Sequence, residues 1–186
     1  MNIHNSTYLI TISLILVFAG CEYIDENNQA GCNTIDDFQI NIVAAIQPWD
    51  LESLDPVSDT QNYFGVLSEA SDDYDSYDIP EPPVGGCTNC INAYFSHAEW
   101  DSSFGDNFTQ EFQSNLFCDT KEWNLDVKAT CGGSSYLTFN YDSIPGNILI
   151  EIFYDDSSLV ITDGSMIEFT LSPNIAKDFL IKVSAN

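Results

Sequence analysis

The sequence predicts an all-β protein: a single antiparallel, immunoglobulin-like β-sandwich that follows a signal peptide and a flexible acidic tether. Three observations favour this fold class. Short segments of alternating apolar and polar residues recur along the chain, turns containing Gly or Pro separate them, and no segment has the period of an amphipathic helix. The chain has 186 residues, and the part that follows the leader, 37–186, has the size of one domain.

The N-terminal leader is an apolar run over residues 8–20, too short to span a bilayer comfortably and as long as a signal-peptide core. It ends in Phe18-Ala19-Gly20-Cys21, which resembles the bacterial lipobox. The resemblance implies that 1–20 is a lipoprotein signal peptide and that a lipid on Cys21 anchors the chain to a membrane. The alternative is an ordinary cleaved signal that leaves Cys21 for a disulfide.

Residues 21–36 are polar and acidic and lack a period, so we expect a tether. This stretch resembles the surface-export signals of some Bacteroidetes lipoproteins. The resemblance implies an outer-membrane lipoprotein of the cell envelope that faces the exterior.

The cysteines of an exported chain are expected to form disulfides. If Cys21 carries lipid, five cysteines remain, and we expect Cys32 in the tether to be the unpaired one. The disulfide candidates are Cys87, Cys90, Cys118 and Cys131. Their three pairings stay open, and the Cys87-Thr88-Asn89-Cys90 spacing lacks both the βαβ setting of a redox motif and the second close pair of a zinc site.

The clearest predicted strand is 122–129, where polar and apolar residues alternate without an exception. Trp123, Leu125, Val127 and Ala129 should share its buried face. Further strands are expected at 38–46, 91–95, 136–141, 148–154, 159–162, 166–171 and 179–183. Asp163-Gly164 lies between two of them and predicts a hairpin, because this dipeptide tolerates positive φ.

The segment 55–90 interrupts the strand rhythm with acidic, aromatic and proline residues. We expect an ordered loop that ends in an extended, polyproline-like stretch. Phe64-Gly65, the run 70–75 and the run 78–83 resemble a β-sandwich module that precedes type IX secretion sorting domains in secreted Bacteroidetes proteins. That family implies no enzymatic activity for this chain.

Two kinds of binding site compete with structural explanations of this loop. Carboxylates at Asp72, Asp73, Asp75 and Asp78 are candidate Ca²⁺ ligands, although the spacing of an EF-hand is absent. The alternative is a loop in which Asp side chains bind their own backbone. Tyr74, Tyr77, Tyr94 and Trp100 are candidates for an aromatic platform that binds carbohydrate, and the alternative is that they pack against the protein.

The charge balance excludes one class of partner. Asp and Glu number 29 against four Lys, and the net charge of −25 disfavours nucleic acid, whose recognition needs clustered cations. No catalytic motif accompanies His97, which we expect to be a strand-end residue near Trp100. We therefore expect no enzyme and no required cofactor, but a structural or protein-interaction module of the envelope. A carbohydrate-binding module, with or without calcium, is the alternative.

Overall fold

The computed structural model describes residues 31–49, 56–83, 90–100 and 102–185, and it is all-β. None of these residues belongs to a helix that is long and apolar enough to cross a bilayer. The elements are β1 (Asn33–Thr34), β2 (Phe38–Pro48), β3 (Val57–Leu67), β4 (Ile79–Pro80), β5 (Ile91–Ser96), the 3-10 helix η2 (Ala98–Trp100), β6 (Asn107–Ser114), β7 (Leu116–Phe117), β8 (Lys121–Ala129), β9 (Gly133–Asn140), β10 (Ile148–Tyr154), β11 (Ser157–Val160), β12 (Met166–Leu171) and β13 (Lys177–Ala185).

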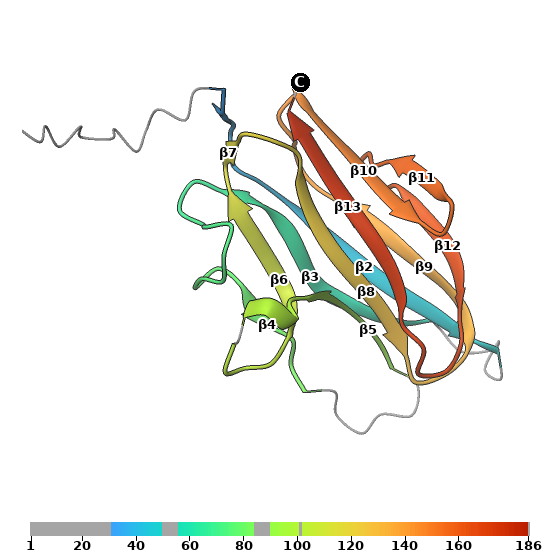
Figure 1. The fold of residues 1–186 in the computed structure, drawn as a ribbon. Helices are drawn as coiled ribbons and strands as arrows, with labels where there is room; N and C mark the ends of the chain where they lie inside the picture. The colour runs from blue at the N-terminus through green and yellow to red at the C-terminus, as the bar shows by residue number, and fades with distance from the viewer. Residues whose placement is uncertain (1–30, 50–55, 84–89, 101, 186) are drawn as a thin grey trace, which may run out of the picture.

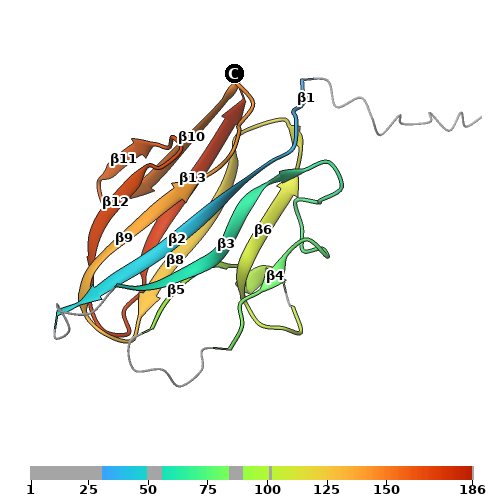
Figure 2. The same ribbon diagram turned by 180° about the vertical axis from the view of Figure 1, so that it is seen from behind.

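Most strands belong to one curled sheet in the order β11-β10-β13-β8-β5-β6-β3-β2-β9-β12, with β4 added beside β6. Neighbours pair antiparallel except β3 and β6, which are parallel. The sheet curls so that β10, β13 and β8 lie in front of β9, β2 and β3 in Figure 1, and Figure 2 shows the second group from its own side. The all-β class is confirmed at the level of this curled sheet.

The core lies between the two facing parts of the sheet, and β8 shows how the sequence builds it. Its residues alternate between buried and solvent-facing, as the pattern predicts, with Trp123, Leu125 and Val127 fully buried. The Trp123 ring packs 5.3 Å from the Phe64 ring of β3. Burying one large apolar side chain stabilises a fold by about 1.5–3 kcal/mol, so this face holds β8 against the opposite strands.

Two central strands, β3 and β6, were not predicted, and the expectation of a loop from residue 55 onward is wrong for Val57–Leu67. Both strands carry polar residues at buried positions, which a hydrophobic pattern assigns to the surface. Asn62 of β3 is buried because its amide donates to the Ile42 carbonyl and accepts from the Thr109 hydroxyl of β6. Pairing between elements distant in sequence thus satisfies polar groups that alternation alone cannot place.

The hairpin predicted at Asp163-Gly164 is also wrong. A turn does form, with the Ser165 amide donating to the Thr162 carbonyl and Gly164 at φ +73°. However, β11 pairs with β10 and β12 pairs with β9, so this turn connects opposite ends of the sheet. The tight hairpin joins β10 to β11 instead, where Asp155 adopts φ +49°, a conformation that Asp tolerates better than most residues.

Candidate functional site

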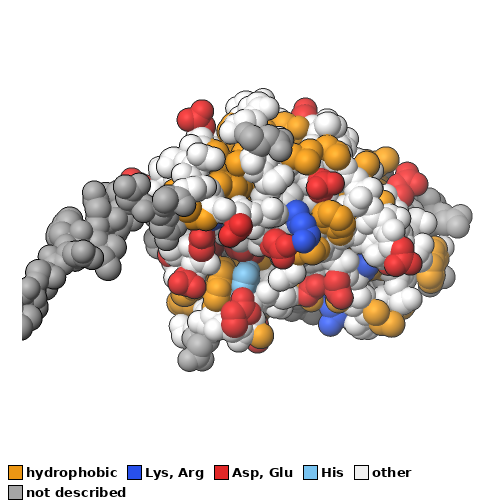
Figure 3. All heavy atoms as spheres, turned by 45° about the horizontal axis from the view of Figure 1, so that its top comes forward, with side chains coloured by type: hydrophobic (Ala, Val, Ile, Leu, Met, Phe, Trp, Pro, Cys, Tyr) orange, Lys and Arg blue, Asp and Glu red, His pale blue; other side chains and the backbone are white. Residues whose placement is uncertain are grey.

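The candidate site is the acidic loop, residues 71–78, together with the surface of β6 and η2 that supports it. The loop joins β3 to β4, and β4 pairs with β6. Carboxylates are not confined to this region: the face in Figure 3 carries red Asp and Glu side chains across its width, with few blue Lys side chains among them. Charge alone therefore does not distinguish the loop from the rest of the surface. The contacts of its side chains do.

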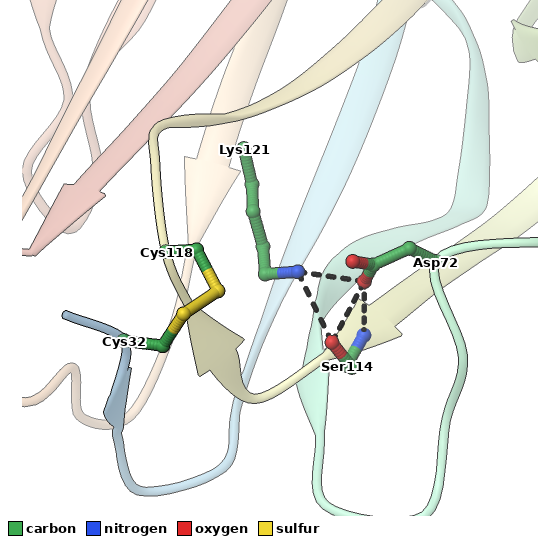
Figure 4. The surroundings of a disulfide bond; sticks show 5 residues. All are labelled: Cys32, Asp72, Ser114, Cys118 and Lys121. Atoms are coloured by element: carbon green, nitrogen blue, oxygen red, sulfur yellow. Dashed lines mark hydrogen bonds and ion pairs between the residues drawn. A yellow bond between two sulfur atoms is a disulfide. The ribbon is translucent and has the colours of Figure 1, made fainter. Parts of the chain in front are cut away.

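Asp72 fixes the first part of the acidic loop to β6 and β8. Its Oδ1 lies 2.6 Å from the Lys121 ammonium and accepts hydrogen bonds from the backbone amide and the hydroxyl of Ser114, at 2.9 and 2.8 Å (Figure 4). Burial works to raise the pKa of Asp72, but the bonds from Lys121 and Ser114 outweigh it and hold the pKa below its usual value. Lys121 is itself only 7% exposed, so its charge is committed to this contact.

Asp75 and Asp78 shape the second part of the loop. Asp75 accepts from the backbone amides of Ser71 and Tyr77, at 2.6 and 2.7 Å. Asp78 is 2% exposed and accepts from the amides of Asp75 and of Phe112 in β6, at 2.9 and 3.0 Å. Burial raises the pKa of Asp78 to about 6, with these two backbone donors acting in the opposite direction.

Three of the four predicted calcium ligands, Asp72, Asp75 and Asp78, therefore use their carboxylates to bind the loop backbone and its neighbours. Asp73 is exposed, and its carbonyl accepts from the Ser71 hydroxyl. Within the described part of the chain, no group of three or more His, Cys, Asp or Glu is arranged to hold a metal ion. Calcium binding by Asp72, Asp73, Asp75 and Asp78 remains a prediction, and the contacts agree with the alternative of Asp residues that stabilise a turn.

The predicted aromatic platform is only partly assembled. Tyr74 and Trp100 lie together, with ring centroids 5.7 Å apart and planes inclined by 37°. Tyr77 instead donates from its hydroxyl to Glu69 at 2.6 Å. Tyr94 lines a pocket of about 280 Å³ that includes neither Tyr74 nor Trp100. The four side chains do not form one flat surface.

His97 follows the end of β5 and stacks on Trp100, with centroids 3.5 Å apart and planes inclined by only 6°, which confirms the predicted position. Its Nδ1 lies 2.6 Å from Glu99, and its Nε2 lies 2.8 Å from Glu111. Burial lowers the pKa of His97, but Glu111 and Glu99 raise it further than burial lowers it. The two carboxylates therefore favour the protonated form of the imidazole.

Glu111 is fully buried on β6, and burial raises its pKa while His97 and Gln113 oppose this shift. Each ring nitrogen of His97 thus faces a carboxylate rather than a nucleophile. The cluster of His97, Glu99 and Glu111 instead joins η2 to β6. Trp100 and Tyr74 both contact Phe108 of β6, at 5.0 and 5.4 Å between centroids, and so connect it to the acidic loop.

Sequence reasoning missed Glu111 and Lys121. Glu111 carried no signal, since β6 itself was not predicted. Lys121 did carry one: it stands in phase with Trp123 and Leu125 on the apolar face of β8, where an isolated cation needs a partner.

The disulfide expectations require correction. Cys32 is bonded to Cys118, 86 residues away, so the prediction that it is unpaired is wrong (Figure 4). The pairing of β1 with β7 brings Cys32 and Cys118 together. It also fixes β1, which belongs to the segment that the sequence predicted to be a flexible tether. Cys131 is the free cysteine among the described residues, which contradicts its assignment as a disulfide partner.

Cys90 is disulfide-bonded, in agreement with its prediction as a disulfide candidate. Cys21, Cys87 and the predicted signal peptide 1–20 lie outside the described residues. No family model, curated protein or solved structure matches the chain.

Proposed function

We propose that this protein is a lipid-anchored, surface-exposed module of the outer membrane that has no catalytic role and uses the acidic loop to bind a protein partner. The observation that carries the proposal is the way the loop is held. Asp72, Asp75 and Asp78 are committed to fixing its backbone, while Tyr74 is 37% exposed. The immunoglobulin-like layering belongs to the same proposal, with the two facing parts of the sheet as its layers.

A loop that is rigid before binding loses less conformational entropy when a partner arrives. Tyr side chains in such loops provide contact area at a low entropic cost. The surrounding carboxylates, including Glu69 and Asp73, favour a partner with a basic surface, because complementary charge speeds association and rejects acidic competitors.

Carbohydrate binding at the predicted platform has weaker support. His97 covers one face of the Trp100 ring, and the inclined Tyr74 ring does not extend the plane of the other face. A sugar that stacks on aromatic rings needs an open face.

A photo-crosslinking amino acid at Tyr74 in intact cells tests the protein-binding role. We expect a discrete adduct there and none from the same group at Ile175, which is 62% exposed on another loop. Asp78→Asn should reduce the adduct because its single amide oxygen cannot accept from both the Asp75 and the Phe112 amides, which loosens the loop. Asp156→Asn in an exposed turn should not reduce it. No adduct at Tyr74, or equal adducts at both positions, would contradict the proposal.

Metabolic labelling with an alkyne analogue of palmitate tests the anchor. The wild-type chain should incorporate the label and sediment with membranes, and Cys21→Ala should do neither, because the acyl chains supply the membrane affinity. Cys131→Ala is the matched control, since it also removes one cysteine and should keep the label. Label that persists in Cys21→Ala would show that the lipid is elsewhere.

A further inference from the structure

We propose a second binding site: a groove over the outer surface of β3, β2 and β9 that takes a neutral carbohydrate. The groove is open to solvent and has a volume of about 490 Å³, within the range of about 300–1,000 Å³ in which small-molecule sites usually lie. It uses none of the residues that hold the acidic loop, so this proposal stands apart from the protein-binding role.

The floor of the groove is a row of side chains across three strands. Asn41 of β2 stands directly opposite Tyr63 of β3 on one side and Asn140 of β9 on the other. Directly paired residues point to the same face of a sheet. The neighbours Ile40, Ile42 and their partners face the core, so this row faces outward.

The amide of Asn41 is held in one orientation. Its nitrogen donates to the carbonyls of Thr60 and Asn62, at 2.9 and 3.1 Å. Both of its N–H groups are thereby used, which leaves the amide oxygen as the group that Asn41 offers to a ligand. A hydroxyl group of a ligand can donate to that oxygen.

The wall is formed by the end of β9 and by the turn between β11 and β12. Asp163 of that turn accepts a hydrogen bond from the Tyr141 amide at 3.0 Å, and the Gly164 amide donates to the Phe139 carbonyl at 2.8 Å. Asp37, which also lines the groove, accepts hydrogen bonds from Ser68 and Asn115. The groove is therefore built by contacts that exist before any ligand binds.

The lining selects the class of ligand. Three carboxylates, Asp37, Asp142 and Asp163, line the groove together with Tyr63 and Tyr141, and no Lys or His of the described residues does so. An anionic ligand would be repelled, and the three carboxylates do not converge on a metal site within the described chain. A neutral sugar fits, because its hydroxyls donate to Asp and Asn oxygens while its C–H faces pack on tyrosine rings.

Direct binding measurements on the full-length protein in detergent test this site. The probes are neutral oligosaccharides of glucose, mannose, galactose and xylose, beside uronic-acid and sulfated oligosaccharides. We expect a neutral probe to bind, with or without EDTA, and Tyr63→Ala and Asn140→Ala each to weaken it by roughly tenfold. Tyr136→Ala, on the same face of β9 but outside the groove, should change affinity less than about twofold.

Circular dichroism of each variant checks that it folds. If Tyr63→Ala does not fold, the test rests on Asn140→Ala, which changes an exposed side chain. The proposal is overturned if no neutral probe binds, if acidic probes bind better, or if EDTA abolishes binding. It is equally overturned if Asn140→Ala binds like wild type, or if Tyr74→Ala rather than the groove variants removes binding.

Discussion

His97 contributes to stability through its charge, because it lies between the buried Glu111 and the exposed Glu99. Its pKa in the folded protein is above the ordinary value of 6.5. The stabilising contribution is therefore complete below pH 6.5 and is lost as the pH rises through the folded pKa. Asp78, whose pKa rises from 3.8 to about 6, likewise makes stability fall with rising pH, but in the lower window between these values.

We expect urea unfolding to show a decrease in wild-type stability from pH 6 to pH 8. The double variant His97→Gln with Glu111→Gln should lack this slope, because neither member of the pair titrates. At pH 7 the single variant His97→Gln should be less stable than the double variant. It should lie about 3–5 kcal/mol below wild type, since it leaves the buried Glu111 carboxylate without its cationic partner. A double variant with the wild-type slope would assign the pH dependence to other groups.

At the scale of elements, the acidic loop depends on β6, a strand that the alternation of apolar and polar residues did not predict. Asp72 binds Lys121 of β8 and Ser114 of β6, and Asp78 binds Phe112 of β6. Lys121 also lies 5.4 Å from the centre of the Phe117 ring, beside the disulfide-bonded Cys118. The loop is thus supported by residues that follow it in the sequence: Phe112 comes 34 positions after Asp78, and Lys121 comes 49 positions after Asp72.

Lys121→Met should lower the free energy of unfolding by about 1–2 kcal/mol, because it keeps the packing but removes the charged partner of Asp72, which water only partly replaces. Hydrogen exchange of residues 71–78 should become faster. Lys128→Met is the matched control: it lies on the same strand, is exposed, and should stay within about 0.5 kcal/mol of wild type. Equal effects in both variants would mean that the ion pair does not support the loop.

At the scale of the whole molecule, the Cys32–Cys118 disulfide closes a large covalent loop. It joins the segment before β1 to the segment after β7, with a sequence separation of 86 residues. Cross-linking residues so far apart restricts the unfolded chain strongly, and stabilisation by such bonds is typically about 2–5 kcal/mol.

Cys118→Ser should therefore lower the unfolding free energy by about 2–5 kcal/mol in denaturant titration. Cys131→Ser should change it by less than about 1 kcal/mol, because Cys131 is free and half-buried. Thiol labelling of the unfolded, unreduced protein should modify Cys131 in wild type and not in Cys131→Ser. A Cys118→Ser variant as stable as wild type would show that the β1–β7 pairing holds without the bond.

The sequence was sufficient to predict features for which the local pattern and the tertiary environment agree. Period and spacing predict the all-β class, the alternation of β8 and the position of His97 beside Trp100. The lipid anchor at Cys21 remains a prediction from the sequence. The tertiary structure decided whatever depends on partners distant in the chain: β3 and β6 with their buried Asn62 and Glu111, the pairing of Cys32, and the course of the chain through Asp163-Gly164. The groove over β3, β2 and β9 is of the same kind, because strands that lie apart in sequence become neighbours only when the sheet closes. A polar or charged side chain is buried only when its partner is present, and no local pattern contains that partner.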